Sequence, residues 1–149
     1  MFVLGIVGSG RKQGRTAELT AAALSGAAAK GARTERVYLA DYELRYHLGV
    51  AAKGAPYCPD ALAALCEEAD AIVLGSPVYY GDINGLMRSF MDDAPIPNSN
   101  GKLALGFAIA GGSGKGLLSG IQSIYHYFYH RQMRAIDPTP VSRFNMEAA

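Results

Sequence analysis

A glycine-rich segment with hydroxyl and basic side chains, residues 8–16, has the composition of an anion-binding loop. It reads GSGRKQGRT and stands directly before an Ala-rich stretch that favours a helix. Backbone N–H groups at the start of a helix, with the helix dipole behind them, favour a phosphate. The segment therefore predicts a phosphate site, although a tight turn with solvated basic side chains is also compatible with these residue types.

The glycine spacing of this segment fits neither of two common nucleotide-binding patterns. The Walker pattern needs four residues between its glycines, whereas five separate Gly8 from Gly14 and three separate Gly10 from Gly14, and Arg15 takes the place of the lysine. The Rossmann pattern G-x-G-x-x-G fails by one residue, and Asp41 lies 27 residues beyond Gly14 rather than about 20. Neither a nucleoside triphosphatase nor a dinucleotide-binding Rossmann domain is supported.

Two more segments of similar character follow apolar stretches further along the chain. Residues 75–81 read GSPVYYG after the apolar run 71–74, and residues 111–116 read GGSGKG after the apolar run 103–110. Parallel sheets bind ligands beyond the carboxyl ends of their strands. The three segments therefore predict one composite site at one edge of a sheet.

Alternating strands and helices must position these loops. The apolar patterns predict strands at 2–7, 36–40, 71–74, 103–110 and 133–136, and helices at 16–30, 59–69, 83–91 and 117–128. Residues 41–58 show no period and predict a loop, and Asp82 or Asn84 is the expected cap of the third helix. This alternation predicts a parallel sheet covered on both faces.

Length, composition and charge narrow the class of protein. At 149 residues the chain suits one domain over residues 1–149, and half of its residues are apolar. A net charge of +1 offers no broad basic field, so nucleic acid is not an expected partner. No apolar run approaches the roughly 18 residues of a membrane span, and the short apolar start carries no basic region. We expect a cytoplasmic protein without a membrane partner.

Two motifs together resemble a known family. Residues 8–16 match G-S-x-R-x-x-G-x-T, and residues 75–81 match G-[ST]-P-x-Y-[FYW]-G, each after the expected strand. These motifs are similar to those of the NADPH-dependent FMN reductases and iron–sulfur flavoproteins of the flavodoxin superfamily. Residues 87–92 and 124–133 resemble later helices of the family, and the likeness spans about residues 2–136.

The resemblance implies a particular fold. We expect a flavodoxin-like three-layer α/β/α sandwich with a parallel five-stranded sheet in the order 2-1-3-4-5. Family members usually continue into a last helix that covers the sheet, whereas residues 146–149 stand where that helix should begin. We therefore expect the last helix to be short or absent, with one sheet face partly bare or covered by a partner subunit.

The resemblance also implies a site for FMN. Aromatic rings can stack on a flavin and glycines allow its close approach, although Tyr79 and Tyr80 are also compatible with ordinary packing at a strand end. Three sets of residues are implied, for the phosphate, the isoalloxazine and its other edge respectively: Ser9, Arg11, Lys12, Gln13, Gly14, Arg15 and Thr16; Pro77, Val78, Tyr79, Tyr80 and Gly81; and Gly111, Gly112, Ser113, Gly114, Lys115 and Gly116. No catalytic protein group is expected, because the flavin carries the chemistry.

The function implied is an FMN oxidoreductase that passes electrons from NAD(P)H to a small-molecule acceptor, in a homodimer or homotetramer. A non-enzymatic flavodoxin-like electron carrier is the alternative, and a ligand-free interaction module is a third. Carriers usually have T-x-T-G-x-T in the first loop and an acidic surface. The Arg-containing loop and the near-neutral charge of this chain favour the reductase.

Other candidate groups have simpler interpretations. The iron–sulfur members carry four clustered cysteines, whereas this sequence has only Cys58 and Cys66, so we expect no cluster within one chain. His126 and His130 have a metal-binding spacing, but no acidic or thiol residue nearby completes a site. The adjacent carboxylates at 92–93 point apart and favour a solvated helix end. The aromatic residues at 125–129 favour an interface.

Overall fold

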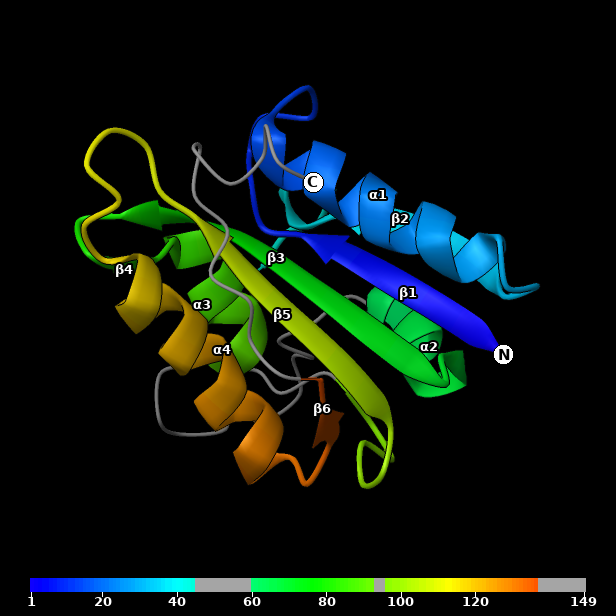
Figure 1. The fold of residues 1–149 in the computed structure, drawn as a ribbon. Helices are drawn as coiled ribbons and strands as arrows, with labels where there is room; N and C mark the ends of the chain where they lie inside the picture. The colour runs from blue at the N-terminus through cyan, green and yellow to red at the C-terminus, as the bar shows by residue number, and fades with distance from the viewer. Residues whose placement is uncertain (45–59, 93–95, 137–149) are drawn as a thin grey trace.

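Strands and helices alternate along the chain as the apolar pattern predicts (Figure 1). The computed structural model describes residues 1–44, 60–92 and 96–136. In chain order its elements are β1 (Phe2–Val7), α1 (Arg15–Ala28), β2 (Arg33–Tyr38), the 3-10 helix η1 (Leu39–Asp41), α2 (Asp60–Glu68), β3 (Ala71–Tyr79), β4 (Asp82–Ile83), α3 (Gly85–Asp92), β5 (Leu103–Ile109), α4 (Leu117–His130) and β6 (Arg134–Ala135).

The sheet has the predicted flavodoxin-like order. Its strands follow the order β2-β1-β3-β5-β6, all parallel, and the short β4 pairs antiparallel with β3 alone. With β4 set aside, this is the predicted order 2-1-3-4-5. The register places Val7 beside Gly75, and Gly75 beside Phe107. Strands β3 and β5 extend past the end of β1, to Tyr79 and Ile109, and the loops after β1, β3 and β5 lie at the same end of the sheet (Figure 1).

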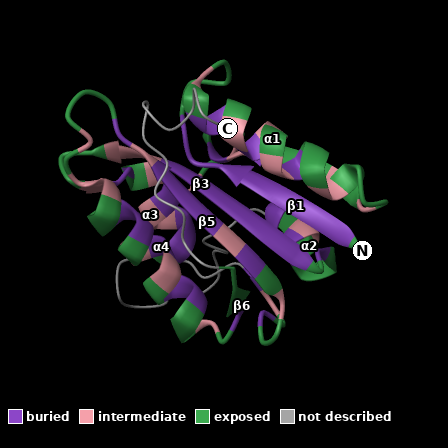
Figure 2. Ribbon diagram, in the orientation of Figure 1, coloured by how far each residue is buried: buried purple, intermediate pink, exposed green. Residues whose placement is uncertain are grey.

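The larger part of the core lies between the sheet and α2, α3 and α4. Alternate residues of each strand face this side, and Leu4, Ile72 and Leu74 are fully buried there. Helices α3 and α4 contribute Phe90 and Phe128, which are also fully buried. Figure 2 shows the central strands buried over most of their length, as expected for a parallel sheet between helices.

Helix α1 is the only described helix on the other face. The buried cluster beneath it is smaller and consists of Val3, Leu24, Ala71, Val73 and Phe107. Beside α1 this face carries an apolar groove of about 230 Å³, bordered by the exposed side chains of Met1, Leu103 and Ile136. The sequence predicts a short or absent last helix for such a face, and residues 137–149, where it would lie, are outside the described part of the chain.

Several element bounds differ from the predicted ones. Strand β2 begins at Arg33 rather than at residue 36, because Arg33 pairs with Phe2 and its guanidinium covers the Phe2 ring. Strand β3 runs on to Tyr79. Ile83, which the helical spacing placed in the third helix, lies in β4, and the helix begins only after Asn84, which is confirmed as its cap.

Parts of the predicted loops fall outside the description. Of the loop 41–58, Asp41 belongs to η1, whereas residues 45–58 lie outside the described residues, as do Pro59, Asp93 and Pro95. Among the helices that are described, none is both long and apolar enough to cross a membrane.

Close packing of α1 on β1 leaves no room for a side chain at Gly5. A Cβ there would lie 2.6 Å from Cγ2 of Thr20, so we expect Gly5→Ala to lower the free energy of unfolding by about 1–3 kcal/mol. Gly26 is exposed within α1 and a Cβ added there has nothing within 4 Å outside the helix's own backbone, so Gly26→Ala should raise that free energy by about 0.5–1 kcal/mol. Urea unfolding measures both, and equal effects would contradict this packing.

Candidate functional site

A cleft of about 230 Å³ opens where the loops after β1, β3 and β5 meet. Nine of the residues that line it are among those predicted from the sequence, and Ile109 at the end of β5 is an addition. The lining residues are Ser9, Arg11, Gly14, Arg15, Thr16, Pro77, Val78, Tyr79, Ile109 and Gly111. The structure therefore brings together residues from three distant parts of the sequence. Ile109 lies in an apolar strand pattern, so composition alone gave no signal for it.

One buried amide side chain joins the first two loops. The Nδ2 group of Asn84 donates a hydrogen bond of 2.6 Å to the carbonyl of Gly8. Its Oδ1 accepts from the backbone N–H of Met87 at 3.1 Å, which caps α3. The Ser76 hydroxyl accepts from the Asn84 N–H at 3.2 Å and lies 3.3 Å from Asn84 Oδ1. Because Asn84 and Ser76 are both buried, these bonds are shielded from water.

The second and third loops touch through their backbones. A Cβ added at Gly116 would lie 2.3 Å from the Cα of Gly81, so only glycine allows this contact. Gly116 and Gly81 also have positive φ, at 83° and 94°. Tyr80 has φ of 52°, so both central residues of the β3–β4 turn have the positive φ of a type I′ hairpin. The hairpin therefore lies directly against the loop that follows β5.

The start of α1 lines the cleft, and no side chain caps it. Its N-cap residue is Gly14, which has no side chain to accept a hydrogen bond from the first turn. Arg11 and Arg15 also line the cleft, and Arg15 makes an exposed ion pair with Glu18 at 3.0 Å. Backbone donors and two guanidinium groups give this end of the cleft a chemistry that suits an anion.

The Lys12 side chain pairs with an acidic residue that does not line the cleft. Its Nζ lies 2.6 Å from Oδ1 of Asp41, and 5.6 Å from the ring centre of Tyr38. Neither Lys12 nor Gln13 lines the cleft, although the sequence-based prediction included both. The pairing partner of Lys12 comes from η1, beyond β2, and the loop sequence alone carries no sign of it.

The predicted residues not yet described lie outside the lining of the cleft, with the exception of Tyr79. Tyr79 lines it and is 56% exposed, whereas Tyr80 is fully exposed at the tip of the hairpin. Gly81 and the segment 112–116 also lie outside the lining. Within that segment Gly112, Ser113 and Lys115 are exposed.

The chemistry of the cleft suits a ligand with two different ends. The backbone donors of α1 and the guanidinium groups match an anionic group. The other wall is formed by Pro77, Val78 and Ile109 with the Tyr79 side chain, and it matches a flat, apolar ring. Among the described residues, none with a charged side chain forms this wall, so the cleft offers binding and orientation more than acid–base chemistry.

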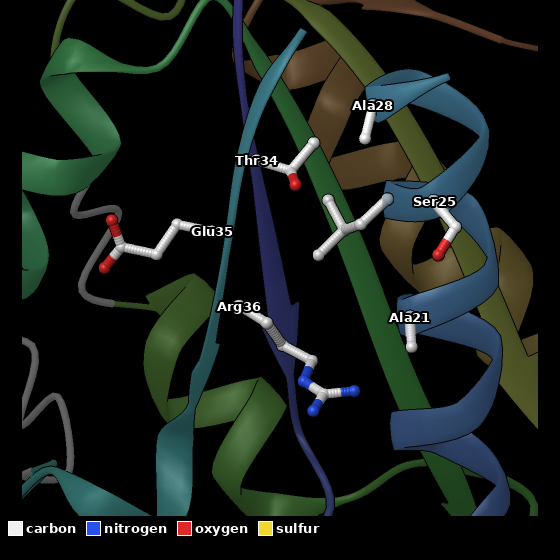
Figure 3. Close-up of a pocket in the computed structure, with 7 residues that line it drawn as sticks. Ala21, Ser25, Ala28, Thr34, Glu35 and Arg36 are labelled. Carbon is white, nitrogen blue, oxygen red and sulfur yellow. The ribbon is translucent and has the colours of Figure 1, made fainter.

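A second groove, of about 310 Å³, lies away from these loops (Figure 3). It runs between α1 and the edge strand β2, where Thr34 and Arg36 face the helix and Glu35 points away. The guanidinium of Arg36 donates to the carbonyl of Ala17 at 3.2 Å, which satisfies one of its donors within the fold. The groove therefore has the features of a helix–strand junction rather than of a ligand site.

The other candidate groups do not assemble into a centre. His126 and His130 are both exposed on α4, and the described residues contain no group of three or more potential metal ligands. Cys66 is buried in α2, while Cys58 lies outside the described residues. Asp92 is exposed at the end of α3, and its neighbour Asp93 is likewise outside the description.

Comparison with known proteins identifies a family that matches most of the chain. A family model described as NADPH-dependent FMN reductase matches residues 1–144. An iron–sulfur flavoprotein of Methanocaldococcus jannaschii is 35% identical over 152 residues, covering 93% of this chain and 79% of that protein.

Solved structures show the same fold. An apo NADH:FMN oxidoreductase has a TM-score of 0.75 at 19% identity, covering 99% of this chain and 78% of its own. A flavodoxin from the domain Archaea has a TM-score of 0.69 at 22% identity, covering 93% and 80%.

Removing the Asn84 side chain should destabilise the fold. We expect Asn84→Ala to lower the free energy of unfolding by about 2–4 kcal/mol, because buried donors and acceptors lose their partners and α3 loses its cap. Asn84→Asp keeps the capping oxygen but places a carboxylate against the Gly8 carbonyl, so it should also destabilise. The exposed Asn100→Ala should change stability by less than about 0.5 kcal/mol. A similar loss in all three variants by urea unfolding would contradict this role.

A matched pair of glycine substitutions tests the contact between the second and third loops. Gly114 and Gly116 both have positive φ, so alanine costs about 1 kcal/mol at each position. Only Gly116→Ala also collides with Gly81, whereas a Cβ at Gly114 has nothing within 4 Å. We expect Gly116→Ala to lower the free energy of unfolding by about 1–3 kcal/mol more than Gly114→Ala does. Equal losses would mean that the two backbones are not in contact.

Proposed function

The chain belongs to the NADPH-dependent FMN reductase family, and from this premise we propose that it is an FMN-dependent oxidoreductase using NAD(P)H as electron donor. The observation that carries the proposal is the two-ended cleft at the carboxyl ends of β1, β3 and β5. It combines an anion-binding helix start with an apolar wall. These are the two features that the phosphate and the ring system of FMN require.

We propose that the phosphate of FMN lies at the start of α1. The backbone N–H groups of the first turn would donate to its oxygens, and the hydroxyl of Thr16 and the guanidinium groups of Arg11 and Arg15 add further donors. Lys12 is held in its ion pair with Asp41 and would not contact the phosphate directly. The phosphate assignment thus rests on a smaller set than the whole segment 8–16.

The ring system would lie between the second and third loops. Pro77, Val78 and Ile109 exclude water from one side, and Tyr79 is exposed enough to stack on a planar group. The glycines at 111–116 allow backbone N–H groups to approach the polar edge of the ring. When bound, FMN supplies hydride and single-electron chemistry, and the protein supplies position and electrostatics.

The overall reaction proposed is the oxidation of NAD(P)H by a small acceptor, which gains two electrons. No side chain of the cleft needs to act as an acid, base or nucleophile. Two cysteines are fewer than the four thiolates of an iron–sulfur cluster, so the proposal routes electrons through flavin alone within residues 1–149.

Purified protein tests the proposal directly. A flavin absorbance band, or saturable binding of added FMN, is expected first. The flavin-loaded protein is then assayed for NADPH and NADH oxidation with a quinone, an azo dye and free flavin as acceptors. Turnover with at least one supports the reductase, and no turnover with any overturns it. Reduction by a protein donor but not by NAD(P)H would identify an electron carrier instead.

The phosphate assignment can be separated from ring binding by comparing FMN with riboflavin, which lacks the phosphate. We expect Arg11→Ala to raise the Kd for FMN about tenfold and to leave the Kd for riboflavin nearly unchanged, because a charge-assisted hydrogen bond is lost. Lys12→Ala should have a smaller effect, since Asp41 already holds this side chain.

Lys30→Ala serves as the control, because Lys30 is an exposed cation beyond the other end of α1. It should leave both constants unchanged. An equal rise in the Kd for FMN and in the Kd for riboflavin in Arg11→Ala would refute the phosphate assignment. Fluorescence titration of the flavin measures every constant.

A further inference from the structure

A compact polar network lies at the base of the β3–β4 hairpin. Oδ1 of Asp82 accepts hydrogen bonds from the Ile83 N–H and from the Ser123 hydroxyl, each at 2.7 Å. Its Oδ2 accepts from the Arg88 guanidinium at 3.1 Å, and Arg88 also donates to Ser123 Oγ at 3.3 Å. One carboxylate thus joins β4, α3 and α4.

This network differs from an isolated surface ion pair. A single exposed pair contributes roughly 0–1 kcal/mol, because two flexible side chains must be ordered in water. Here Asp82 is about half exposed, with 45% of its side chain accessible, but its carboxylate has three donors. One of these donors is a backbone N–H and another is a short side chain on a helix. The carboxylate therefore has little freedom to move.

The network lies next to the conformationally demanding part of the hairpin. Tyr80 and Gly81 both have positive φ, and for Tyr80 this conformation costs about 1 kcal/mol or more. The neighbouring residue Asp82 follows Gly81 directly and holds its end of the turn to α4. On the same helix a Cβ at Gly120 would lie 3.1 Å from Cγ2 of Val78, so helix and hairpin are also in close contact there.

We propose that Asp82, held by Ser123 and Arg88, is a positioning residue that fixes the Tyr79–Gly81 turn against the third loop. The turn carries Tyr79, which lines the cleft, and Gly81, which meets Gly116. The network thereby sets the separation of the two loops that enclose the ring. This inference rests on the proposed flavin site, and it concerns the ring end and not the phosphate end.

The first test uses flavin affinity. We expect Asp82→Ala to raise the Kd for FMN roughly tenfold and Ser123→Ala roughly threefold, with Asp82→Asn in between because it keeps the Oδ1 acceptor. The Kd for riboflavin should rise by the same factors, since the phosphate is not involved. Ser123→Thr keeps a hydroxyl at this position, so its Kd for FMN should stay close to that of the unsubstituted protein. Ser119→Ala, at an exposed serine of the same helix, is the matched control and should have no effect.

A structural role alone would not change the flavin itself. We therefore expect Asp82→Ala also to shift the midpoint potential of bound FMN and to alter the shape of its visible absorption band. Urea unfolding of each variant checks that the fold is retained. An unchanged Kd, potential and spectrum in folded Asp82→Ala would overturn the inference.

The second test needs no flavin. Hydrogen exchange of the apoprotein should be faster at residues 80–83 in Asp82→Ala and Ser123→Ala, and unchanged in Ser119→Ala and Ser123→Thr. Unchanged exchange at 80–83 would overturn the inference whether or not FMN binds. Faster exchange in a chain that does not bind FMN would instead locate the failure in the proposed function.

Discussion

Asn84 connects the ends of β1 and β3, and the geometry of the site depends on that connection. Parallel strands bring the loops after them to one edge of the sheet, but this alone does not fix the distance between the loops. The amide does so, because its donor reaches the Gly8 carbonyl while its acceptor caps α3. Hydrogen bonds of Asn84 therefore tie the start of the first loop to Ser76 of β3 and to the start of α3.

Much of the fold follows from the sequence because its signals are local. Strands such as 2–7 and 71–74 are buried on both faces and have an unbroken apolar pattern, and the order of the sheet follows from the alternation with helices. The hairpin was missed because its turn is Tyr80-Gly81, whereas the usual sequence signal of a two-residue hairpin is Asn-Gly or Asp-Gly. Ile83 then fitted the helical spacing by accident. Strand β2 was placed too late, because Arg33 and Glu35 are exposed at the edge of the sheet and give no apolar signal.

The site was predictable where a residue type itself suggests the chemistry. Glycines, hydroxyls and cations before a helix indicate an anion, and five of the ten residues lining the cleft come from the segment 8–16 identified in this way. Four more come from the segments that follow the third and fourth predicted strands. What the sequence could not show is the direction in which each side chain points. Lys12 belongs to the same run of cations as Arg11, but an acidic side chain beyond β2 holds it away from the cleft. The contact between Lys12 and Asp41, which are far apart in sequence, thus decides where the Lys12 side chain lies.

The unequal division of the core gives the cleft a thermodynamic consequence. Among the described residues, α1 is held by the smaller of two buried clusters, while α2, α3 and α4 share the larger one. Yet the start of α1 also lines the cleft, where its backbone donors and the guanidinium groups of Arg11 and Arg15 suit an anion. A ligand bound there would stabilise the native state by mass action, through the one described helix that packs on this face of the sheet. Under the proposed function, the concentration of FMN would therefore set the stability of the protein as well as its occupied fraction.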